Sequence, residues 1–105
     1  MTGTPPITIT PEHWAMVRDI LQKHVPSCEV WAFGSRVTGR VKPYSDLDLA
    51  VISDTPVGWQ LIEDLKEDFS DSDLPWRVDV VDWASTHPEF QAIIASHKVV
   101  VQRRA

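Results

Sequence analysis

Three aspartates in apolar surroundings are the residues of this sequence whose types and spacing best suit catalysis. Asp46 and Asp48 are two residues apart, and Asp79 stands later between Val78 and Val80. Alternate residues of a strand point to the same side, so we expect Asp46 and Asp48 to project together. Neighbouring carboxylates repel each other unless a cation compensates them. Carboxylate oxygens on a rigid strand suit Mg²⁺, which also accepts phosphate oxygens and water.

Asp79 is expected to reach the same site from a neighbouring strand. Three carboxylates can hold two metal ions, which stabilise the attacking and leaving oxygens of an in-line displacement. Asp82 is an alternative third ligand, but Asp79 is favoured because valines flank it, whereas Asp82 precedes an expected loop. The simpler interpretation of Asp46 and Asp48 is two exposed acids at a strand end. It is less favoured because Asp79 and a glycine-serine pair accompany them.

This glycine-serine pair, Gly34-Ser35, follows a short apolar run and is expected to open a turn of helix. Glycine lets the backbone approach a phosphate closely. The N–H groups of Ser35 and Arg36 would then point outward at a helix N-terminus, which is an anion site. Among the basic side chains, Arg36 is the first candidate for a triphosphate contact. Arg40 and Lys42 are further candidates, with ordinary surface charge as the alternative for each of the three.

Taken together, these residues resemble the signature of the DNA polymerase β-like nucleotidyltransferase superfamily. The pattern is Gly34-Ser35, ten intervening residues, Asp46-x-Asp48 and a later Asp79. The short chain, Gly39 after the serine, and Pro88-Glu89-Phe90 before a valine strand are similar to its minimal nucleotidyltransferase (MNT) branch. That branch includes the MntA-type antitoxins, which are paired with HEPN-domain toxins. The resemblance covers roughly residues 12–101.

The resemblance implies roles for the residues that carry it. Asp46 and Asp48 would ligate both Mg²⁺ ions, and Asp79 would complete one metal site and help to deprotonate the acceptor hydroxyl. Gly34 and Ser35 would hold the nucleoside triphosphate. In the antitoxin relatives ATP is the donor and the acceptor is a tyrosine of the partner toxin.

Three functions are therefore compared. The first is an antitoxin that transfers AMP from Mg·ATP to a HEPN toxin. The second is a non-catalytic binding module that neutralises its partner by occlusion. The third is transfer to a small molecule of the aminoglycoside type, which the lack of a second domain disfavours unless a homodimer builds the acceptor pocket.

The elements that must position these residues alternate between helix and strand, so the expected class is α/β (α+β) around one mixed sheet. Residues 1–9 are expected to be an extended lead-in, and residues 10–105 a single nucleotidyltransferase domain. Three helix starts are expected from capping signals: Thr10-Pro11, Thr55-Pro56, and Thr86 with Glu89. Strands are expected at residues 29–33, 46–52, 77–81 and 99–101, with a short helix and a loop between residues 35 and 45.

Composition limits the remaining possibilities. The 105 residues carry a formal charge of −5, which disfavours direct binding to a nucleic-acid backbone. No apolar run approaches the roughly 20 residues of a membrane helix, and the N-terminus does not have the pattern of a signal peptide. The single cysteine, Cys28, cannot form an internal disulfide, which favours a cytoplasmic protein.

Overall fold

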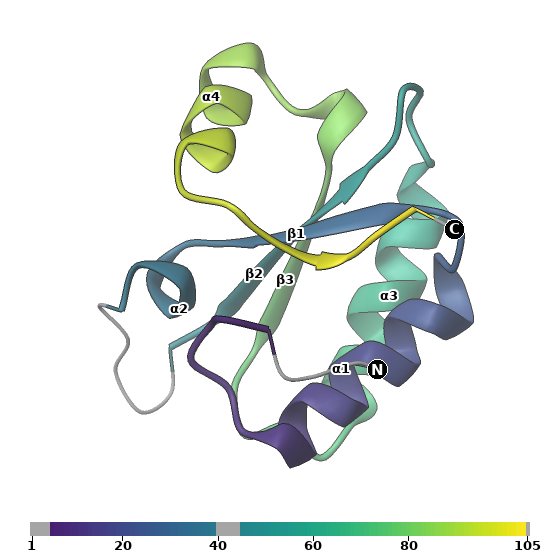
Figure 1. Cartoon of the computed structure of the whole chain (residues 1–105). Helices are drawn as coiled ribbons and strands as arrows, with labels where there is room; N and C mark the ends of the chain where they lie inside the picture. The colour runs from purple at the N-terminus through teal and green to yellow at the C-terminus, as the bar shows by residue number, and fades with distance from the viewer. Residues whose placement is uncertain (1–4, 40–44, 105) are drawn as a thin grey trace.

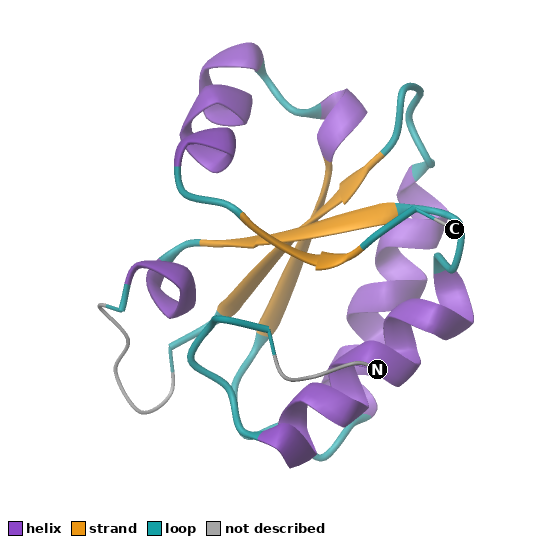
Figure 2. Cartoon of the chain, in the orientation of Figure 1, coloured by secondary structure: helices purple, strands orange, loops and turns teal. Residues whose placement is uncertain are grey.

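A computed structural model of the chain describes residues 5–39 and 45–104. Helices and strands alternate along it, and their order and bounds are α1 (Pro11–His24), β1 (Glu29–Phe33), α2 (Ser35–Thr38), β2 (Leu47–Ile52), α3 (Trp59–Asp71), β3 (Val78–Asp82), the 3₁₀ turn η1 (Trp83–Ser85), α4 (Pro88–Ser96) and β4 (Val99–Gln102). Figure 1 shows their arrangement, and Figure 2 separates helices from strands by colour. The expected α/β class is confirmed.

Among the described residues, the strands form one mixed four-stranded sheet in the order β3-β2-β1-β4. β1 runs antiparallel to both β2 and β4, whereas β2 and β3 are parallel. α3 is the crossover that parallel strands require between them. The two strands that were expected to carry the aspartates are therefore direct neighbours.

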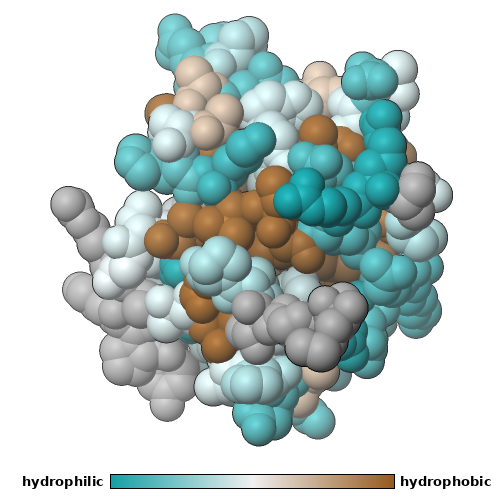
Figure 3. Space-filling model, in the orientation of Figure 1, coloured by the Kyte–Doolittle hydropathy of each residue, from teal (hydrophilic) through white to brown (hydrophobic). Residues whose placement is uncertain are grey.

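Helices cover both faces of this sheet, as Figure 1 shows. On one face α1 and α3 pack together over the main core, which includes the fully buried Leu21, Leu49 and Leu65. On the other face α4 covers only part of the sheet, over a smaller cluster around Phe33 and Ile94. The second face is therefore left partly open, and a hydrophobic band is visible in Figure 3 over β4.

The first helix begins where its sequence predicted. The Thr10 side chain accepts a hydrogen bond from the His13 N–H at 3.3 Å, and Pro11 occupies the first turn, where its missing N–H costs nothing. The helix ends at His24, two residues before Pro26. Its buried face carries Trp14, Val17 and Leu21.

The start of α3 differs from the expectation at Thr55-Pro56. The helix begins at Trp59, after Gly58 with φ of +95°. The backbone N–H of Val57 donates to Oδ2 of Asp82 at 3.1 Å, which ties this segment to the end of β3. A tertiary hydrogen bond therefore outweighs the local capping signal.

The expected capping box of the last helix, Thr86 with Glu89, is also wrong. The Thr86 hydroxyl instead donates to the carbonyl of Asp82 at 2.7 Å. His87 becomes the N-cap, and its Nδ1 accepts from the Glu89 N–H at 3.3 Å.

No helix among residues 5–39 and 45–104 is both long enough and apolar enough to cross a membrane.

Candidate active site

The register of the sheet places three of the relevant side chains in one row. Phe33 of β1 pairs with Asp48 of β2, and Asp48 pairs with Asp79 of β3. Paired residues of neighbouring strands point to the same face. The row therefore presents an aromatic ring and two carboxylates on the partly open face of the sheet. This juxtaposition of Asp48 and Asp79 was expected from the sequence.

Asp46 precedes β2 and is exposed, whereas Asp48 lies within β2 and is half-buried. Burial, followed by the nearby charges of Asp79 and Asp46, raises the pKa of Asp48 to about 6. Both effects disfavour the ionised form of the carboxyl group. The three aspartates thus form one electrostatic cluster, and a bound cation would relieve its repulsion.

Gly34 makes room for this cluster. Its φ of +82° is a conformation that residues with a side chain rarely adopt. A methyl group at Gly34 would collide with the carboxylate of Asp48. The turn after β1 therefore lies directly against the carboxylate, and only glycine allows the approach. The α2 turn that follows ends at Gly39, which also has φ of +82°, but a methyl group there would meet no atom of the described residues within 4 Å, its chain neighbours apart.

A pocket of about 370 Å³ opens beside the row. Its polar lining includes Asp48, Asp79 and His97. Its remaining lining comes from the α2 turn, the strands and α4: Phe33, Gly34, Thr38, Val81, Phe90 and Ile93. Phe90 and Ile93 lie on α4, the helix that also carries the fully buried Ile94. They are 39% and 63% exposed, and they form an apolar wall of this pocket.

Ser35 begins α2, as expected, but the side chain of Arg36 turns into the protein and is only 5% exposed. Its Nε donates to the carbonyl of Ser45 at 3.0 Å and its Nη1 to the carbonyl of Thr8 at 2.8 Å. The guanidinium also stacks 4.2 Å from the ring centroid of Trp76. Arg36 therefore ties three segments together, and only its backbone N–H remains in our proposed site. The other basic candidates, Arg40 and Lys42, lie outside the described residues.

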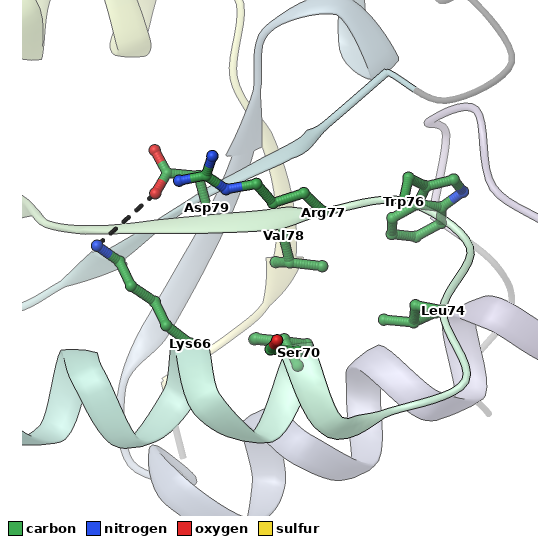
Figure 4. Close-up of a pocket in the computed structure, with 8 residues that line it drawn as sticks. Lys66, Ser70, Leu74, Trp76, Arg77, Val78 and Asp79 are labelled. Carbon is green, nitrogen blue, oxygen red and sulfur yellow. Dashed lines mark ion pairs between the residues drawn. The ribbon is translucent and has the colours of Figure 1, made fainter.

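Lys66 is a residue of this site that the sequence did not indicate. Its Nζ lies 3.8 Å from Oδ1 of Asp79, as Figure 4 shows. The lysine comes from α3, which reaches Asp79 around the free edge of β3. It stands within an acidic run of the helix, so an exposed lysine there carried no sequence signal. Only the packing of α3 against β3 brings it to the carboxylates.

Asp82, the alternative third ligand, has a different role. Its Oδ2 accepts from the Val57 N–H at 3.1 Å and from the Ser85 hydroxyl at 3.2 Å, so it joins the segment before α3 to the turn after β3. It does not line the 370 Å³ pocket, which Asp48 and Asp79 do.

Within the described residues, no three acidic, histidine or cysteine side chains are placed closely enough to share a metal ion. The donor set itself, carboxylates with mutual repulsion, has the chemistry that Mg²⁺ prefers.

Comparison with known proteins agrees with this geometry. Residues 16–105 match the family described as polymerase beta, nucleotidyltransferase. The chain is 52% identical over 104 residues to a Haemophilus influenzae protein named probable protein adenylyltransferase MntA. That alignment covers 99% of this chain and 91% of the relative.

Solved structures share the fold. A crystal structure of a toxin-antitoxin with AMP-PNP superposes with a TM-score of 0.72 at 21% identity, covering 84% of this chain and 71% of that one. A crystal structure of the MntA-HepT toxin-antitoxin gives a TM-score of 0.58 at 18% identity, covering 88% of this chain and 71% of the other. With a family match over residues 16–105 and a relative at 52% identity, this chain belongs to the polymerase β-type nucleotidyltransferase family.

Proposed function

We propose that this protein is an antitoxin that transfers AMP from ATP to a hydroxyl group of a partner toxin. The observation that carries the proposal is the approach of Gly34 to Asp48, because it joins the phosphate-binding turn to the carboxylates. The relative at 52% identity is named a probable protein adenylyltransferase, which supports a protein acceptor. The fold neighbours are toxin-antitoxin structures, one of them with AMP-PNP, which supports a toxin partner and an adenine nucleotide.

The residues divide the work in the proposed reaction. The backbone N–H groups of Ser35 and Arg36 hold the β- and γ-phosphates, because the first amides of a helix have no acceptor within it. Asp46, Asp48 and Asp79 would hold Mg²⁺, two ions in the full arrangement, which supplies neutralisation of phosphate charge. The acceptor oxygen bonds to the α-phosphorus, the bond to the bridging oxygen of the β-phosphate breaks, and pyrophosphate leaves. Asp79 takes the proton of the acceptor hydroxyl.

The proposal also specifies the partner, the acceptor group and the cellular compartment. The partner is a toxin of the HEPN type, the acceptor is a tyrosine hydroxyl, and the reaction takes place in the cytoplasm. We expect the nucleoside to lie in the pocket of about 370 Å³, against the apolar wall of Phe90 and Ile93 and next to the carboxylates. A single domain over residues 10–105 and a homodimer remain predictions.

The direct test is intact-mass analysis. The purified protein and the product of its neighbouring gene, as the candidate toxin, are incubated together with Mg²⁺ and ATP. We expect the toxin to gain one or more AMP units, and we expect no gain with Asp48→Asn. The other nucleoside triphosphates are run in parallel to establish the preference for adenine.

The alternative is a binding module that neutralises its partner by occlusion. It predicts a tight complex with no mass gain from any triphosphate, and neutralisation that survives Asp48→Asn. That combination of results would reject the transferase proposal. A mass gain on an added aminoglycoside, with none on the toxin, would move the acceptor to small molecules.

A further inference from the structure

Asp79 forms an ion pair with a lysine of the neighbouring helix α3. Lys66 projects from α3, and its Nζ lies 3.8 Å from Oδ1 of Asp79, across the free edge of β3 (Figure 4). The two side chains are 39% and 40% exposed, so the pair lies at the boundary with water. Asp79 also lines two pockets, the one shared with Asp48 and a second of about 330 Å³ that Lys66 lines. Lys66 therefore stands where the carboxylate cluster meets the sheet edge.

This ion pair is expected to contribute little to the stability of the fold. An exposed ion pair with a long separation contributes at most about 1 kcal/mol and often nothing measurable. By contrast, His24 and Asp68, which join α1 to α3, approach to 2.6 Å. The distance and exposure of the Lys66–Asp79 pair are those of a contact that can open.

Lys66 has a second carboxylate within reach. Glu63, one helical turn earlier on α3, places its Oε2 at 3.7 Å from the same Nζ. Residues three apart on a helix are surface neighbours, so this contact needs no tertiary rearrangement. Lys66 can therefore leave Asp79 and keep an ionic partner on its own helix.

The neighbours of Asp79 on the sheet supply the reason for a nearby cation. Asp48 is its register partner on β2, and both carboxylates lie on the same face. Two such groups repel each other, and a positive charge beside one of them reduces the cost of ionising both. A divalent ion bound by Asp79 would do the same, and the ammonium group would then repel that ion.

We propose that Lys66 is a positioning residue that holds Asp79 in the metal-free protein, competes with the divalent cation for that carboxylate, and keeps Glu63 as its ionic partner when the cation binds. The inference rests on the proposed function, because it requires Asp79 to be a metal ligand. Its consequence is that Lys66 lowers the affinity of the site for a divalent ion. A residue with a purely structural role would not have this effect.

The test is a titration of the full-length, nucleotide-free protein with Mn²⁺ alone, with free ion measured by electron paramagnetic resonance. We expect Lys66→Met to tighten Mn²⁺ binding roughly 3- to 10-fold, the size of a unit charge acting on a divalent ion a few ångströms away near water. Lys66→Arg keeps the charge and should restore the wild-type affinity. Lys23→Met is the matched control, because it makes the same change in net charge at a lysine that pairs with Asp68.

Unchanged or weaker Mn²⁺ binding in Lys66→Met would overturn the inference. Equal tightening in Lys23→Met would also overturn it, because the effect would then be one of net charge. Asp79→Asn separates this failure from failure of the proposed function. If Asp79→Asn weakens Mn²⁺ binding while Lys66→Met changes nothing, only the role of Lys66 is lost. If neither Asp48→Asn nor Asp79→Asn affects Mn²⁺ binding, the proposed metal site is lost as well.

Discussion

Asp48 and Asp68 are half-buried carboxylates on opposite sides of the sheet, and their surroundings act on them in opposite directions. Around Asp48, burial and the charges of Asp79 and Asp46 raise the pKa to about 6. Around Asp68, the hydrogen bond from His24 and then that from Lys23 hold the pKa below its usual range. The first carboxylate is surrounded mainly by other acids, whereas the second lies between two basic side chains of α1.

The difference separates a structural acid from a functional one. Where a carboxylate joins two helices, the fold supplies the compensating donors itself. Where Asp48 and Asp79 face the pocket, the fold concentrates negative charge, and within the described part of the chain it pairs Asp79 with Lys66 at 3.8 Å. Perturbed groups of the second kind gather at functional sites, since the missing compensation comes from a ligand. Variants at these two places should therefore fail in different ways.

The largest expected effect is on transfer by Asp48→Asn. If Asp48 holds a catalytic ion, as proposed, its replacement should lower AMP transfer to the partner toxin by about 10³-fold or more, a magnitude typical of lost electrostatic stabilisation. Asp68→Asn, which is the same chemical change on the other side of the sheet, should leave the rate within a few-fold of wild type. Rates are measured as AMP incorporated into the toxin per unit time. Equal losses in the two variants would remove the distinction between the two acids.

The second expected effect concerns the two glycines with the same backbone conformation. Gly34→Ala and Gly39→Ala both force an L residue to φ of +82°, at a cost of about 1 kcal/mol each. Only Gly34→Ala also drives a methyl group into the carboxylate of Asp48. It should therefore lower transfer about 100-fold, the cost of a misplaced reacting group, whereas Gly39→Ala should retain most of the activity.

Thermal unfolding of both glycine variants gives the control. A similar decrease in Tm would show that they share the same backbone strain. Similar losses of transfer in both would contradict the special position of Gly34, because a methyl group at Gly39 meets nothing within 4 Å among the residues that the structure describes, its chain neighbours apart.

Much of this arrangement was predictable from local sequence. The Thr10-Pro11 cap and the apolar runs located α1 and the strands, and the spacing of Gly34, Asp48 and Asp79 indicated one site. These signals succeed because capping, alternation and glycine turns depend on residues close together in the chain.

Features that depend on tertiary contacts were not predictable. The side chain of Asp82 accepts a hydrogen bond from the Val57 N–H, and α3 starts later than expected. The carbonyl of Asp82 accepts a hydrogen bond from the Thr86 hydroxyl, so that hydroxyl does not cap the last helix. Arg36 directly follows Ser35, but its side chain turns inward to the carbonyls of Thr8 and Ser45. Each contact joins segments whose proximity follows only from the finished fold.

A smaller effect is expected in the pH dependence of stability. Because the pKa of Asp48 is raised to about 6, the folded state binds more protons than the unfolded state between pH 3.8 and pH 6. Asp48 therefore makes the metal-free protein less stable as the pH rises through this window, by about 1–3 kcal/mol in total. Asp48→Asn should be more stable than wild type at pH 7, and the two should converge near pH 4. Denaturant unfolding in a chelator at several pH values measures this, and Mg²⁺ should recover part of the loss at pH 7.

The smallest expected effect is the opposite pH slope at Asp68. Its pKa lies below the usual value because His24 and Lys23 favour the charged form, so its contribution to stability is present above the ordinary carboxyl range. That contribution is lost as the pH falls through the lowered pKa. Asp68→Asn should therefore lower Tm at pH 7, by less than Gly34→Ala does, and the difference from wild type should shrink on acidification. If Asp68→Asn instead stabilised the protein at pH 7, as Asp48→Asn is expected to do, the two acids would not differ in kind, and the pairing with α1 would have no structural role.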